Sequence, residues 1–118
     1  MPSPLRFSTP ISWVHCVLAD FDAFLLDHAA AEKKASGMAI SMVSNYPDKT
    51  RLVSEMVELA IEELVHYKEV IKVIHQRGLN LIADEKDAYI LAMRQTVRHE
   101  KNANFLDRLI TAGIIEAR

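Results

Sequence analysis

The stretch that decides the fold runs from Thr50 to Gly78 and reads TRLVSEMVELAIEELVHYKEVIKVIHQRG. It predicts one long helix that begins near Asp48 or Thr50 and ends at Arg77. No proline or glycine interrupts it before Gly78, where a left-handed helix cap is expected. The residues of its inner face recur at steps of three and four: Val53, Met56, Ala60, Glu63, Tyr67, Val70 and Ile74. A helix of this length is typical of helical bundles.

A second long helix is expected to precede this one, opening at Asp20. It should end near Tyr46, because Pro47 disfavours helical geometry in the residue before it. Its inner face reads Phe21, Phe24, Leu25, His28, Glu32, Ala35, Ala39 and Val43. Around the two helices we expect an extended arm at 1–11, a short turn at 12–18, a loop at 78–84, and helical segments at 87–98 and 101–118.

The composition fits a single all-α domain over residues 1–118. Half of the 118 residues are hydrophobic, and only three are glycine and four are proline. The net charge of −2 provides no basic tract that binds nucleic acid by charge alone. No apolar run reaches the ~18 residues that a membrane span needs. The one cysteine, Cys16, excludes an intramolecular disulfide, and we expect a cytoplasmic location.

Three carboxylates fall where apolar residues are expected. Glu32 lies seven residues after Leu25, Glu63 seven after Met56, and Glu116 seven after Leu109. Because a buried, unpaired carboxylate costs several kcal/mol, each of the three needs a hydrogen-bonding partner or a metal ion.

His66 follows Glu63 by three residues, so both side chains leave the same face of the helix. A carboxylate and a neutral imidazole suit ferrous iron or manganese. The order Glu32, Glu63-x-x-His66, Glu116 matches the first three ligand groups of di-iron four-helix bundles. A single Glu-x-x-His also arises by chance, and a buried ion pair is then its commoner explanation. The position of His28 predicts either a hydrogen-bonded core histidine or a residue that donates a hydrogen bond to a metal ligand.

Three runs of the sequence resemble the MiaE-type tRNA hydroxylases: DHAAAEKKA at 27–35, EELVHY at 62–67 and IIEAR at 114–118. The resemblance extends over nearly all of the chain from Trp13 onward. It implies a ferritin-like four-helix bundle and an oxygen-dependent, non-haem di-iron monooxygenase. The family hydroxylates the isopentenyl group of a methylthio-isopentenyl-adenosine in tRNA. Carried over by motif, Glu32, Glu63, His66 and Glu116 would be ligands of two iron ions, with molecular oxygen as co-substrate.

The family pattern continues with a serine-cysteine-glutamate-arginine run and a second Glu-x-x-His helix, and neither occurs in this sequence. We therefore expect a bundle that is truncated after Arg118. Three explanations stay open: a piece of a longer protein, a shortened homologue without activity, or a homo-oligomer. In the last, two copies would each contribute Glu32, Glu63 and His66. The alternative function is a ferritin-like helical module that dimerises without catalysis, and a third is iron binding without oxygenase chemistry.

Overall fold

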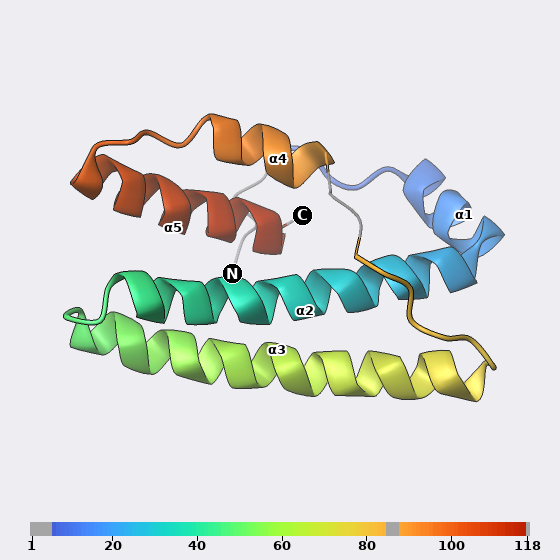
Figure 1. Cartoon of the computed structure of the whole chain (residues 1–118). Coiled ribbons are helices and arrows are strands. Elements are labelled where there is room, and N and C mark those ends of the chain that lie inside the picture. Colours follow the sequence, from blue (N-terminus) through green and yellow to red (C-terminus); the bar gives the residue numbers. More distant parts are fainter. Residues whose placement is uncertain (1–5, 85–87, 118) are drawn as a thin grey trace. The chain divides into compact units, whose positions relative to one another are not determined.

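In a computed structural model, the chain folds into helices, and the part it describes, residues 6–84 and 88–117, contains no strand (Figure 1). The helices are α1 (Ile11–Ala19), α2 (Phe21–Asn45), α3 (Thr50–Gln76), α4 (Ala88–Gln95) and α5 (Lys101–Ala117). The predicted all-α class and both long helices are confirmed. The expected turn at 12–18 is wrong in extent, because α1 is a helix of nine residues. Among the described residues, no helix is long and apolar enough to cross a membrane.

Local signals set the ends of α2 and α3. The side chain of Asp20 accepts a hydrogen bond of 3.1 Å from the backbone N–H of Ala23, which caps α2. After α3, Gly78 adopts a φ of +73°, a left-handed conformation that glycine reaches without a steric penalty. The backbone N–H of Leu79 then donates to the carbonyl of Ile74 at 3.1 Å, which completes the predicted cap.

Helices α2 and α3 lie side by side along their length (Figure 1). Leu25, Ala29 and Ile74 form a buried cluster against which Leu26, Tyr67, Val70 and Leu79 pack. Farther along the pair, the hydroxyl of Ser36 donates a buried hydrogen bond of 3.1 Å to the carbonyl of Ala60. On α3, all the buried residues belong to the predicted inner face. The prediction for α2 is right only in part, because Ala29, Ser36 and Met42 are buried in place of the predicted Phe21, which is exposed.

Contacts divide the chain into two units, Ser12–Ala83 and a unit made of Met1–Ile11 with Asp84–Arg118. In the second unit, the guanidinium of Arg98 binds both carboxylate oxygens of Asp107 at 2.8 Å. Glu100 caps α5 by accepting backbone hydrogen bonds of 3.1 and 2.8 Å from residues 102 and 103. A single domain over residues 1–118 stays a prediction.

Candidate metal centre

Glu32 of α2 and the Glu63 and His66 pair of α3 meet midway along the two helices. The Nδ1 atom of His66 lies 3.7 Å from Oε2 of Glu32 and 3.9 Å from Oε1 of Glu63. Each of the three side chains offers one ligand atom, and these atoms all lie within 4.8 Å of one another. The hydrogen bond from Ser36 to Ala60, about one helical turn away on each helix, holds the register that brings them together.

Exposure differs among the three side chains. The carboxyl of Glu63 is 9% exposed and that of Glu32 is 14% exposed, whereas the imidazole of His66 is 46% exposed. The neighbouring Glu62 points to solvent, as its helical phase predicted. The cluster is therefore closed on the side of the two carboxylates and accessible on the side of the histidine.

The carboxyl group of Glu63 shares a hydrogen bond with that of Glu32, and this contact favours the protonated form of Glu63 in the absence of a cation. The pKa of Glu63 is raised to about 7, chiefly by a hydrogen bond with Glu32, then by burial and by the negative charge of Glu32, and His66 lowers it only in part. Near neutral pH, a proton on Glu63 therefore takes the place that a positive ion could occupy. A divalent cation between the carboxylates would satisfy both of them.

The donor set of two carboxylate oxygens and one imidazole nitrogen fits ferrous iron or manganese. Both ions accept mixed oxygen and nitrogen ligands, and di-iron carboxylate proteins use this combination on facing helices. Three protein ligands also leave positions for water, oxygen or further ligands. The residues present therefore fit the iron that the sequence pattern predicted.

Glu116 was the fourth expected ligand. It lies in α5, but its side chain is outside the residues whose side chains the structure describes. Its role stays a prediction.

Sequence reasoning did not find Ser36, a buried polar residue in the α2–α3 interface. A serine within an apolar stripe was the available signal, but its acceptor on the other helix depends on the register of the pair.

A helix pair that carries inward carboxylates and a histidine is typical of ferritin-like helical proteins. The structural comparison confirms this class. A protein from Synechococcus described as "Protein 43 with aldehyde deformylating oxygenase activity" matches with a TM-score of 0.91 and 34% identity, over 96% of this chain and 56% of that one.

The family follows from the sequence comparisons. The family model described as tRNA-(MS[2]IO[6]A)-hydroxylase (MiaE) matches residues 2–118, and the chain belongs to this family. A tRNA 2-(methylsulfanyl)-N(6)-isopentenyladenosine(37) hydroxylase from Pseudomonas putida is 34% identical over 93% of this chain and 54% of its own length. The hydroxylase of that name from Salmonella typhimurium is 29% identical over 92% of this chain and 40% of its own length. The chain thus spans about half the length of these curated relatives or less.

Proposed function

We propose that this chain carries one iron-binding half of an oxygen-dependent tRNA hydroxylase. The substrate group would be the isopentenyl side chain of a methylthio-isopentenyl-adenosine in tRNA. A tRNA substrate also implies a cytoplasmic location. The observation that carries the proposal is the convergence of Glu32, Glu63 and His66 in a chain of the MiaE family.

The three side chains have distinct tasks in this proposal. Glu32 and Glu63 supply the two negative charges that balance a ferrous ion, and Glu63 gives up its proton. His66 binds through a neutral ring nitrogen from the exposed side of the cluster. Iron held there would supply the activation of molecular oxygen that hydroxylation of an alkyl group requires.

A complete di-iron site needs more ligands than these three. In di-iron bundles, two helices each provide a glutamate and two each provide Glu-x-x-His. This sequence contains one Glu-x-x-His, at Glu63 and His66, and Glu116 is the further carboxylate that the family resemblance offers. We therefore assign Glu32, Glu63 and His66 to one ion and propose Glu116 as part of the coordination of the pair.

Metal analysis tests the site. Protein loaded anaerobically with ferrous iron and passed through a desalting column should retain iron, and Glu63→Ala or His66→Ala should lose it. Glu62→Ala is the matched control, because Glu62 is the adjacent carboxylate and points to solvent. Wild-type protein without iron above background would contradict the proposal, as would equal loss of iron in the control.

Product analysis tests the reaction. The iron-loaded protein, oxygen and a two-electron reductant are incubated with tRNA that carries the methylthio-isopentenyl nucleoside. One oxygen atom of O2 enters the product and the other leaves as water, so the digested nucleoside should gain the mass of one oxygen atom. Iron retention without this product would favour iron binding alone.

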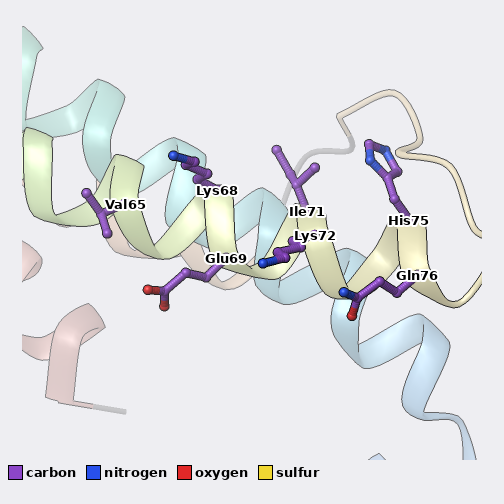
Figure 2. Close-up of a pocket in the computed structure, with 7 residues that line it drawn as sticks. All are labelled: Val65, Lys68, Glu69, Ile71, Lys72, His75 and Gln76. Carbon is purple, nitrogen blue, oxygen red and sulfur yellow. The ribbon is translucent and has the colours of Figure 1, made fainter.

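One observation favours a second function, a helical module that dimerises without catalysis. Helix α3 exposes apolar side chains outside the metal cluster: Ile61 is 59% exposed, Leu64 50% and Val65 48%. An open pocket beside them is lined by α3 residues that include Val65, Lys68, Ile71 and Lys72 (Figure 2). This function predicts a dimer by light scattering, weakened by Ile61→Ser, with no bound iron.

A further inference from the structure

His28 lies directly behind Glu32 on α2, one helical turn before it. Its Nε2 atom is 3.2 Å from Oε1 of Glu32, a hydrogen-bonding distance. The other oxygen of the same carboxylate, Oε2, is the one that faces His66 across the cluster, at 3.7 Å. The two oxygens of Glu32 therefore have different neighbours, one on its own helix and one on α3.

We propose that His28 is a positioning residue that holds Oε1 of Glu32 and leaves Oε2 as the metal-binding atom. The inference rests on the metal centre proposed above. His28 itself is not part of the group of ligand atoms that lie within 4.8 Å of one another, which comprises Glu32, Glu63 and His66. It acts through the carboxylate that it contacts.

An aromatic group, defined here as Trp13, Phe21 and Phe24, restrains the imidazole of His28. The ring of Phe24 stacks on His28 with centroids 5.6 Å apart and an angle of 13° between the planes. Phe24 in turn contacts Trp13 edge to face at 5.9 Å and stacks on Phe21 at 6.0 Å. Because the side chain of His28 is 43% exposed, solvent would otherwise leave its ring free to turn. Aromatic stacking of this kind is worth about 0.5–1.5 kcal/mol for each pair.

The consequence for the metal is a fixed carboxylate. A glutamate side chain can bind an ion through one oxygen or two, and a free carboxylate samples both arrangements. With Oε1 held by an imidazole N–H, Glu32 offers one oxygen in one direction. Groups that orient a ligand in this way typically contribute 10- to 100-fold to metal affinity.

The test uses Co²⁺ as the probe, because its visible absorption reports the number and geometry of its ligands. His28→Leu should weaken Co²⁺ binding by about 10- to 100-fold and change the spectrum. His28→Gln keeps an N–H donor and should restore most of the affinity and the wild-type spectrum. His75→Leu is the control, since this exposed histidine lines the separate pocket on α3 and should change neither (Figure 2).

Phe24→Leu provides a second test, for the case in which circular dichroism shows that His28→Leu does not fold. It removes the stacking partner but keeps the histidine, so it should produce a smaller loss in the same direction. If His28→Leu folds and its affinity for Co²⁺ and its spectrum are unchanged, the inference about His28 is wrong, although the metal centre stands. If His28→Leu does not fold, an unchanged affinity and spectrum of Phe24→Leu leads to the same conclusion. Wild-type protein that binds no Co²⁺ overturns both.

Discussion

Replacing Glu63 by glutamine should make the metal-free helix pair more stable and at the same time abolish its metal binding. The pKa of Glu63 rises from 4.5 to about 7 in the folded chain, chiefly because it shares a hydrogen bond with Glu32. At pH values between these two, the folded state holds a proton that the unfolded chain has released. The free energy of unfolding therefore falls as the pH rises through this window.

The size of the effect follows from the two pKa values. Linkage gives a loss of about 2.5 kcal/mol for the metal-free wild type between pH 5 and pH 8. Glutamine carries no charge and can still donate an N–H to Glu32, so Glu63→Gln resembles the protonated wild type at every pH. At pH 8 the variant should thus be more stable than wild type by up to about 3.4 kcal/mol, and at pH 5 the advantage should fall below about 1 kcal/mol.

Urea denaturation in the presence of a chelator measures the free energy of unfolding of the wild type and of Glu63→Gln at pH 5 and at pH 8. Glu62→Gln is the matched control, because the side chain it removes is exposed, and its stability should follow that of the wild type at both pH values. A neutral amide is a poor metal ligand. In the absence of the chelator, ferrous iron should therefore make the wild type more stable than Glu63→Gln. The wild type gains about 4.1 kcal/mol at a free metal concentration of 1,000 times Kd, and the variant gains nothing. An advantage of Glu63→Gln that is equal at pH 5 and pH 8 would falsify the interpretation that Glu63 is protonated in the folded chain.

Further predictions concern the packing that supports the site, each measured as the free energy of unfolding in urea. Ile74→Ala should cost about 2–5 kcal/mol, because Ile74 is fully buried, while the exposed Ile61→Ala should change stability by less than about 0.5 kcal/mol; equal costs would contradict the assigned core. Ser36→Ala should cost about 1 kcal/mol through the lost bond to Ala60, and no loss would mean that the bond does not stabilise the pair. Asp20→Ala should cost about 0.5–2 kcal/mol through loss of the α2 cap, whereas Asp20→Asn should retain most of it.

The helices could be predicted from sequence where their signals are local. Asp20, Pro47 and Gly78 each act on the few residues beside them, and α2 and α3 end within about two residues of the expected positions. The helix α1 was underestimated, since its nine residues contain no capping pattern as strong as that of Asp20. The expected segment at 87–98 is shorter in the structure, where α4 ends at Gln95.

The candidate site could also be predicted from the sequence only in part. Helical phase alone placed Glu32 and Glu63 on inward faces, and the structure brings them together with His66. The contact of His28 with Glu32 was one of two open alternatives. Our proposal that His28 acts through Glu32 also draws on the exposure of the ring and the position of Phe24, which the sequence does not give. The raised pKa of Glu63 was beyond prediction, because it depends on the distance between carboxylates of different helices.

The position of the cluster explains how the fold tolerates it. Two nearly buried carboxylates side by side destabilise a metal-free helix pair, and the cost is largest at alkaline pH, where both are charged. Well-packed contacts lie on either side of the cluster along the pair: Ala29 and Ile74 toward one end, and Ser36 and Ala60 toward the other. These flanking contacts hold the helices together without help from the site. The site can therefore keep two adjacent carboxylates whose charges a cation would balance. For this reason, substitutions in the flanks should change stability with and without iron by similar amounts, whereas substitutions at Glu63 should change the two in opposite directions.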